Sequence, residues 1–263
     1  RVALVVHVDL SVAVWFAAMA GMLWSLNSPA RAEGLSWVEL GMCIGGTVLM
    51  SLAAFVDPGT PVMANYIPVL DGTLFLFGLA AFGVGFALQV VRGLWAARSV
   101  GRALGGAGAL RFGLHASLVS AAVALIAFAW SLAVVPRSLD ARAYYEILFW
   151  GGGHALQFVW TLLMLVGWLA LAQASGARVP LSPRLALLMF ALALASVFVT
   201  PYAYLAHEVA TVEHRNLHTW AMRFGGGVAI VPVALAVVLA VGSHRGLSAA
   251  QRPLRAALVA SML

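Results

Sequence analysis

Residues 113–135 read GLHASLVSAAVALIAFAWSLAVV, an apolar run that contains no aspartate, glutamate, lysine or arginine. An α-helix needs about 20 consecutive apolar residues to cross the hydrocarbon core of a bilayer, whereas a membrane β-strand needs only about ten. Unpaired backbone amides are too costly in hydrocarbon, and a helix satisfies all of them within its own segment. This stretch therefore predicts a transmembrane α-helix.

Six further stretches share this pattern, and together with the first they predict about seven membrane spans. Hydrophobic residues make up 63% of the chain and charged residues 9%, whereas about a quarter of the residues in soluble domains are charged. We therefore expect an all-α, polytopic transmembrane helix bundle that is surrounded by membrane lipid. The other six spans are expected near 3–25, 36–56, 70–92, 146–172, 184–203 and 222–243.

Residues 1–263 are expected to form a single transmembrane domain, because no soluble domain and no repeat separates the spans. The chain begins at Arg1 rather than at a methionine, and it ends within LRAALVASML, which resembles the first half of another span. We therefore expect a fragment that is truncated at both ends.

The basic residues predict an orientation in the membrane. All fifteen are arginine, against nine acidic residues, so the net charge is +6. They lie in short loops rather than in one patch, which favours membrane orientation over nucleic-acid binding. Successive loops alternate sides, and ten arginine residues lie on one side against five on the other. The positive-inside rule places the larger set in the cytoplasm, and we expect the inner membrane of a bacterium. That set comprises Arg31, Arg92, Arg98, Arg102, Arg111, Arg178, Arg184, Arg245, Arg252 and Arg255.

In this orientation three histidine residues share one membrane level. His7 near the start of the first span, His154 near the start of the fifth and His207 just after the sixth all lie toward the outer side. Ionisable residues within spans are costly and are candidates for function. Imidazoles from several helices can converge on a metal ion or a haem between those helices. Each of the three could instead be a buried histidine that is merely hydrogen-bonded.

The local sequence distinguishes these histidine residues. His154 follows three glycines in LFWGGGHALQFVW, and such small residues let a bulky group approach the backbone closely. His7 shares a helix face with Ser11, four residues on, whereas Asp9 points elsewhere. Aromatic residues near the span ends, including Tyr66, are expected to form interfacial belts.

The stretch AHEVATVEHRNLHTW offers further donors. His207 is followed at once by Glu208, and His214 and His218 are spaced i and i+4 on a possible helix face. These four residues could bind a metal ion. For His214 and His218 taken alone, we expect instead a solvated loop on the outer side.

Several segments resemble the catalytic subunit I of haem-copper oxidases, especially its B-type branch. DARAYYEILFWGGGHALQFVW, residues 140–160, is similar to the sixth helix of that family, where an LFWxxGHPxxYFW pattern presents the first copper-ligating histidine. YIPVLDGTLFLFGLAAFGVGF, residues 66–86, resembles the start of the fourth helix, and HVDLSVAVWF, residues 7–16, occupies the place of the second. AHEVATVEHRNLHTWAMRFGGGVAIVP, residues 206–232, has the shape of the seventh.

The resemblance implies roles for particular residues in what would be a fragment of a twelve-helix subunit. His7 would be an axial ligand of the low-spin haem, one of two haems in the full-length protein, and His154 would bind copper. His207 would be a second copper ligand, with Glu208 where the family has its other histidine. Phe158 replaces the tyrosine that the family places four residues after the first copper ligand. The His-x-His pair of a later helix would lie beyond the end of this chain.

The implied function is electron transfer to a haem and metal centre that reduces oxygen to water, with proton translocation as an accompanying possibility. A periplasmic donor such as cytochrome c and a copper-bearing subunit II would be the partners. A second candidate function is nitric oxide reduction at non-haem iron, which a carboxylate ligand such as Glu208 would suit better than copper. Two further candidates are a haem-binding membrane protein without turnover and a transporter.

Overall fold

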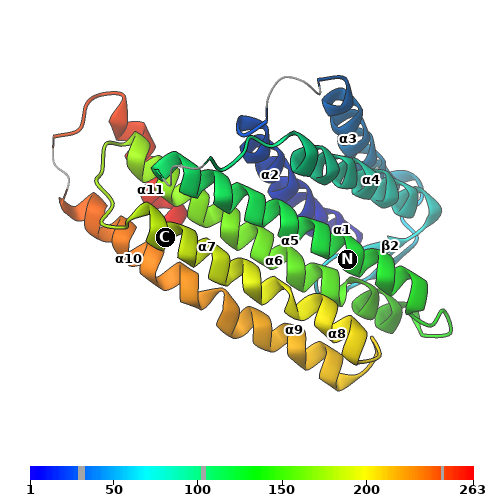
Figure 1. Cartoon of the computed structure of the whole chain (residues 1–263). Coiled ribbons are helices and arrows are strands. Elements are labelled where there is room, and N and C mark those ends of the chain that lie inside the picture. Colours follow the sequence, from blue (N-terminus) through cyan, green and yellow to red (C-terminus); the bar gives the residue numbers. More distant parts are fainter. Residues whose placement is uncertain (29–32, 102–104, 244–245) are drawn as a thin grey trace.

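A computed structural model describes residues 1–28, 33–101, 105–243 and 246–263. The described part is almost entirely helical, with one short hairpin (Figure 1). In chain order the elements are α1 (Val2–Val8), the π-helical turn η1 (Asp9–Val14), α2 (Trp15–Leu26), α3 (Glu33–Val56), β1 (Thr60–Val62), β2 (Val69–Asp71), α4 (Thr73–Ala96), α5 (Gly106–Val134), α6 (Ala141–Ala174), α7 (Pro183–Val197), α8 (Val199–Ala206), α9 (Val212–Gly225), α10 (Gly227–Ser243) and α11 (Gln251–Met262).

The predicted all-α bundle of seven spans is confirmed. Seven helical segments of the described chain are long and apolar enough to cross a membrane, and each overlaps one of the expected spans. They are Val2–Leu26, Gly34–Val56, Thr73–Ala96, Gly106–Val134, Ala141–Ala174, Pro183–Ala206 and Val212–Ser243. Three arginine residues of the orientation count, Arg31, Arg102 and Arg245, lie outside the described residues.

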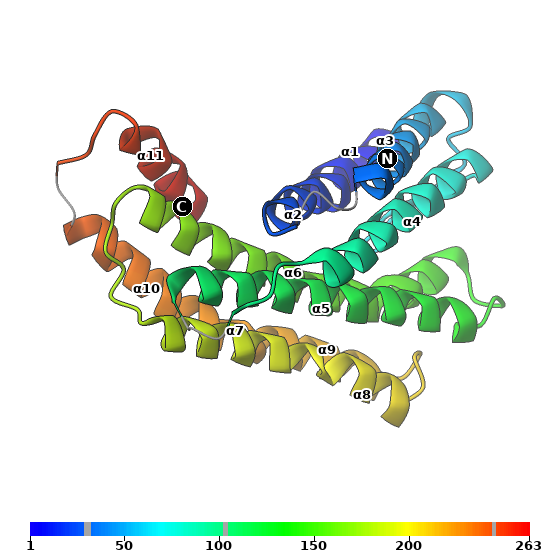
Figure 2. The same ribbon diagram turned by 45° about the horizontal axis from the view of Figure 1, so that its top comes forward.

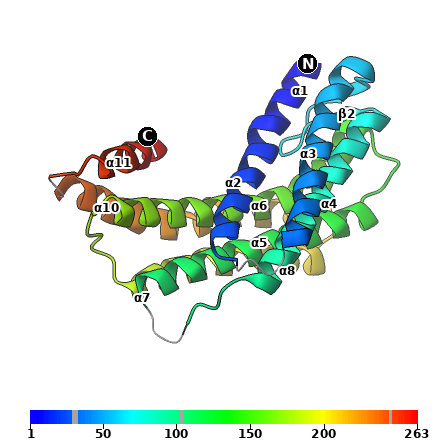
Figure 3. The same ribbon diagram turned by 90° about the horizontal axis from the view of Figure 1, so that it is seen from above.

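Helix α6 lies at the centre of the bundle. It packs along α5 and also contacts α7, α9, α10 and α11 (Figure 2). The N-terminal helices cross this group at an angle, with α3 packed along α4 (Figure 3). The indole Nε1 of Trp24 on α2 donates a hydrogen bond of 2.9 Å to Ser117 Oγ on α5, which ties the two groups together.

The seventh span begins at Val212, well before the predicted start near residue 222. Thr211 caps this helix, because its hydroxyl oxygen accepts a hydrogen bond of 3.3 Å from the His214 backbone amide. Helices α9 and α10 then follow each other as one spanning segment. The sequence pattern missed the first turns because they are rich in polar residues.

The preceding span is interrupted between α7 and α8 at Phe198, whose ψ angle of −3° departs from regular helix. Pro201 lies in the first turn of α8 and has no amide to bond to the carbonyl four residues earlier, which accounts for the break. The break allows α8 to contact both α5 and α9.

The first span contains a π-helical turn. Residues Asp9–Val14 have π rather than α hydrogen bonding, which adds one residue to the turn. Asp9 is 2% exposed and its two carboxylate oxygens have no hydrogen-bond partner among the described residues. His7, two residues earlier, is exposed.

Candidate functional site

Three histidine side chains from two helices meet inside the bundle. His154 on α6 is 3% exposed, and His214 and His218 on α9 are each 1% exposed. The ring centroids of His154 and His218 are 5.6 Å apart, and those of His214 and His218 are 4.7 Å apart. We call these three residues the histidine cluster.

The local sequence of α9 explains how two of the three rings reach the same place. His214 and His218 are spaced i and i+4, so they lie one turn apart on one face of the helix. That face packs against α6, and both rings are buried. The expectation that these two residues lie in a solvated loop was wrong, because the Thr211 cap starts the helix before them.

Backbone carbonyls fix the protonation of the three rings. The Nδ1 atom of His154 lies 2.8 Å from the Trp150 carbonyl oxygen, and that of His218 lies 2.8 Å from the His214 carbonyl oxygen. The Nδ1 atom of His214 lies 3.3 Å from the Ala203 carbonyl oxygen. A carbonyl can only accept, so each Nδ1 carries the proton. In a neutral imidazole the Nε2 lone pair is then free to accept or to coordinate.

Tyr66 contacts the cluster from the loop between β1 and β2. Its hydroxyl oxygen lies 3.1 Å from Nε2 of His154 and 2.9 Å from Nδ1. Burial, followed by the nearby Glu146 carboxylate, raises the pKa of Tyr66 well above its ordinary value, so the phenol keeps its proton. The phenol oxygen thus lies almost equally far from the two ring nitrogens, and because Nδ1 already donates to a carbonyl, Nε2 is the nitrogen that can accept from it.

Two contacts with α6 hold the Tyr66 loop in place. The Asn65 backbone amide donates a hydrogen bond of 2.9 Å to Glu146 Oε2, and the Asn65 side-chain amide donates to Oε1 of the same carboxylate. The Tyr145 hydroxyl donates a bond of 3.0 Å to Asp71 Oδ1 at the end of β2.

Tyr204 on α8 closes the opposite side of the cluster. Its ring meets the His214 ring edge-on at a centroid distance of 4.7 Å and the His218 ring at 6.0 Å. Its hydroxyl shares a hydrogen bond of 2.6 Å with the Ser131 hydroxyl on α5. The tyrosine is therefore anchored to α5 while its ring covers two of the three imidazoles.

The three glycines before His154 each face an aromatic ring. A Cβ atom at any of them would overlap that ring, so only glycine permits this approach. The close packing expected from the glycine run is confirmed. The overlaps pair Gly151 with Tyr204, Gly152 with Phe128 and Gly153 with Tyr66.

The cluster has the donor set of a metal site, although its rings are not turned to a common point. In the described chain no group of three or more histidine, cysteine, aspartate or glutamate side chains is arranged to hold a metal ion as it stands. Rings bound through Nε2 at about 2.0–2.1 Å to one tetrahedral ion have centroids about 5 Å apart, close to the spacing seen here. Nε2 of His218 is buried without a hydrogen-bond partner. The rings would have to turn, but His218 already lies near that spacing from each of the other two rings.

His7 lies apart from the cluster. Its helix α1 packs against α3 and the β1–β2 hairpin, and neither contains a histidine. The exposed imidazole borders a shallow surface pocket with Ser11 and Trp15. The elements that α1 contacts therefore offer no second imidazole, so a haem held by His7 would need its other axial ligand from outside these elements.

His207 and Glu208 also lie outside the cluster. They occupy the turn after α8, where His207 is half-buried and Glu208 exposed. Both line a surface pocket of about 420 Å³ that also touches Tyr204 and Trp130. The structure thus brings His154 together with His214 and His218 rather than with the pair expected from the resemblance.

Phe158 lies one turn after His154 on α6 and is 4% exposed. It packs in an apolar cluster with Val123 and Val197. The phenols near the cluster come instead from Tyr66 and Tyr204. Tyr66 was expected at the membrane interface, and Tyr204 has no distinguishing sequence pattern. The signal that could have found them is the glycine run, because each glycine must face a bulky group.

Comparisons with known proteins find relatives but no family. No family model matches the chain, and no solved structure matches it. An uncharacterized protein of Rickettsia prowazekii (strain Madrid E) is 21% identical over 92% of this chain and 53% of its own length. An uncharacterized protein of Aquifex aeolicus (strain VF5) is 25% identical over 64% of this chain and 42% of its own length. The chain thus spans about half the length of the curated relatives it matches.

Proposed function

We propose that this chain forms part of a membrane redox protein of the haem-copper oxidase kind, with a metal ion held by His154, His214 and His218. The observation that supports the proposal most directly is the buried Nε2 atom of His218, which has no hydrogen-bond partner beside two further imidazoles. A buried polar atom without a partner is costly, and a metal ion would satisfy it. Carbonyl bonds to Nδ1 are also the usual outer support of histidine ligands.

The ligand set removes the argument for non-haem iron and leaves copper as the metal that the resemblance implies. Imidazoles suit copper, iron and zinc alike, whereas the argument for iron rested on a carboxylate ligand. Glu208 is exposed and outside the cluster, so that argument loses its basis. A bound copper ion would supply one-electron chemistry, with oxygen as the proposed acceptor and water as the product. The Tyr66 phenol would hold the His154 ring in place from the side of the loop.

The remaining parts of this proposal concern the whole protein. The low-spin haem at His7, cytochrome c as donor, a copper-bearing second subunit and proton translocation follow from the resemblance. A haem at His7 would lie on the outside of the described bundle, because the imidazole is exposed. The metal site would face the outer side of a bacterial inner membrane under the arginine distribution.

Metal analysis of the purified protein tests the proposal. We expect about one copper ion per chain, lost when either His214 or His218 is replaced by alanine. His115→Ala is the matched control, because its half-buried imidazole also bonds to a carbonyl, that of Arg111 at 2.7 Å, but lies outside the cluster. Iron without copper would support the nitric oxide reductase instead. A metal content that the His214 and His218 variants leave unchanged would refute the site.

A pyridine haemochrome assay of the total haem content, together with the optical spectrum of the intact protein, tests the haem separately. We expect a low-spin haem signal that His7→Ala abolishes while the helical circular dichroism stays unchanged. A haem spectrum that the variant leaves intact would discard His7 as the ligand, and the complete absence of haem would favour the transporter.

A further inference from the structure

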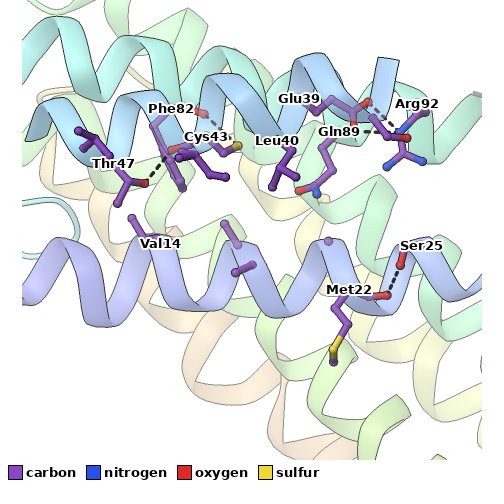
Figure 4. Close-up of a pocket in the computed structure, with 16 residues that line it drawn as sticks. Val14, Met22, Ser25, Glu39, Leu40, Cys43, Thr47, Phe82, Gln89 and Arg92 are labelled. Carbon is purple, nitrogen blue, oxygen red and sulfur yellow. Dashed lines mark hydrogen bonds and ion pairs between the residues drawn. The ribbon is translucent and has the colours of Figure 1, made fainter. Parts of the chain in front are cut away.

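A groove separates α2 from the α3–α4 pair, far from the histidine cluster in sequence and lined by other residues. It encloses about 520 Å³, within the range of small-ligand sites. Figure 4 shows α2 on one side and the two packed helices on the other. Most of its wall is apolar, and includes Val14, Leu40, Ile44, Val48 and Phe82.

The polar groups of the groove gather at one end. Arg92 Nε lies 2.8 Å from both carboxylate oxygens of Glu39, and the two side chains are 9% and 3% exposed. Gln89 lies beside them in Figure 4, on the same helix as Arg92 and one turn before it. Its amide packs against Gly21 of α2, where a Cβ atom would overlap it. The groove thus has one polar end and a long apolar remainder.

This polar end has unused hydrogen-bonding capacity. The ion pair uses only Nε of Arg92, while a guanidinium carries five N–H donors. The side chain of Gln89 makes no hydrogen bond to the described residues, although an amide offers both donors and acceptors. At the other polar positions the hydroxyls are already engaged: Ser25 donates to the Met22 carbonyl and Thr47 to the Cys43 carbonyl.

The charge at this end is balanced, which decides the kind of head group that fits. Glu39 neutralises Arg92, so the end attracts no net anion, and a phosphate placed there would be repelled by the Glu39 carboxylate. A neutral group with oxygen acceptors suits the remaining N–H donors of Arg92 and Gln89. One hydrocarbon chain can then follow the apolar wall.

We propose that the groove binds a neutral, single-tailed amphiphile with a carbonyl-bearing head group, of the lipid-soluble quinone type. The head accepts hydrogen bonds from Arg92 and Gln89, and the tail lies along α3 toward Val14 and Val48. The proposal does not depend on the metal site, because none of its residues belongs to the histidine cluster.

Equilibrium binding of decylubiquinone to the protein in lipid nanodiscs tests this proposal. We expect saturable binding of decylubiquinone and at least tenfold weaker binding of decyl phosphate, which has a tail of the same length but an anionic head. Cys43 lines the groove and is the chain's single cysteine. Bound decylubiquinone should therefore slow the alkylation of Cys43 by N-ethylmaleimide, which locates the probe.

Two variants separate the head-group contacts from simple apolar binding. Gln89→Leu should weaken decylubiquinone binding by about tenfold, through the loss of one hydrogen bond. Gln173→Leu is the matched control, because Gln173 lines a different pocket on α6. Glu39→Gln leaves Arg92 unneutralised and should reverse the preference toward decyl phosphate.

Three results would overturn the proposal. Equal binding of both probes by the unaltered protein would show a groove without head-group selection. Absence of saturable decylubiquinone binding would show that the groove does not take this class. Binding that Gln89→Leu leaves unchanged, with Cys43 alkylated at its original rate, would place the ligand elsewhere.

Discussion

The Tyr66 side chain, which comes from a loop, helps to fix the orientation of the His154 ring on α6. The phenol donates to the imidazole Nε2, while the carbonyl of Trp150 accepts from Nδ1. The ring is therefore held from both nitrogen atoms. If a metal ion binds here, Nε2 is released from the phenol, and Tyr66 remains beside the ligand as a neutral hydrogen-bond donor.

Tyr66→Phe removes this hydrogen bond while keeping the ring against Gly153. We expect a loss of about 0.5–1.5 kcal/mol in the free energy of unfolding of the metal-free protein and a rise of up to about tenfold in copper affinity, because the metal ion no longer has to displace the phenol from Nε2 of His154. Denaturant unfolding and copper titration of the purified protein measure the two. Tyr144→Phe is the control, because the Tyr144 side chain has an edge-on ring contact with Tyr145 rather than a contact with the cluster. An equal effect of both substitutions would contradict the assigned role.

Gly153→Ala places a methyl group where the Tyr66 ring lies. We expect a destabilisation of about 1–3 kcal/mol, the usual range for overpacking in a close-packed site. Gly167→Ala on the same helix is the control, because a Cβ atom there meets nothing within 4 Å, and it should stabilise α6 slightly through helix propensity. Thermal unfolding in detergent compares the two. A Gly153→Ala protein as stable as the Gly167→Ala protein would show that the ring moves away at no cost.

At the scale of elements, the start of α9 decides whether the cluster exists. The Thr211 hydroxyl accepts from the His214 amide and also donates a bond of 2.7 Å to the Glu208 carbonyl. The polar residues of this segment resemble a loop, and the sequence alone placed the span later. The pattern could not reveal that the spanning helix already begins at the Thr211 cap. Because it does, His214 and His218 lie on a buried face of the helix.

Thr211→Ala should therefore loosen both histidine residues together. Loss of an N-cap costs about 1 kcal/mol, and we expect faster amide hydrogen exchange over the first turns of α9, measured by mass spectrometry. Thr219→Ala serves as the control, because its hydroxyl only bonds to the Arg215 carbonyl within the helix. Exchange that Thr211→Ala leaves unchanged would indicate that packing against α6 alone holds the start of α9.

The contact between α3 and α4 rests on small residues and on one ion pair. A Cβ atom at Gly46 or Gly78 would overlap the backbone of the other helix, so the two helices approach as closely as glycine permits. Glu39 and Arg92 then join across the same contact. The sequence count treated Arg92 as a loop cation, whereas its partner on another helix draws it inside the bundle.

Removing one member of this buried pair should be costly, and removing both should be less so. Arg92→Ala leaves an uncompensated carboxylate and is expected to lower the free energy of unfolding by about 3–5 kcal/mol. The double variant Glu39→Leu with Arg92→Met removes both charges and should recover most of that loss. Denaturant unfolding in detergent measures the difference. A double variant less stable than Arg92→Ala would show that the pair itself contributes net stability.

At the scale of the whole molecule, the sequence predicted the helices better than their meeting points. All seven spans follow from predominantly apolar runs, because every segment that crosses the lipid must be mostly apolar. Which histidine residues meet depends on how the helices pack against one another, which no local pattern encodes. His154 was identified because its glycines are unusual, whereas His214 and His218 looked like solvated residues until the packing of α9 on α6 was known.

The extra residue in the Asp9–Val14 turn sets the direction of everything that precedes it. Each residue of an α-helix advances the chain by about 100° around the axis. Deleting one residue from this turn would restore a regular helix and swing residues 1–8 through about that angle relative to α2. The exposed imidazole of His7 would then leave the face of the first span that it occupies now, so a single codon determines the direction in which this side chain points.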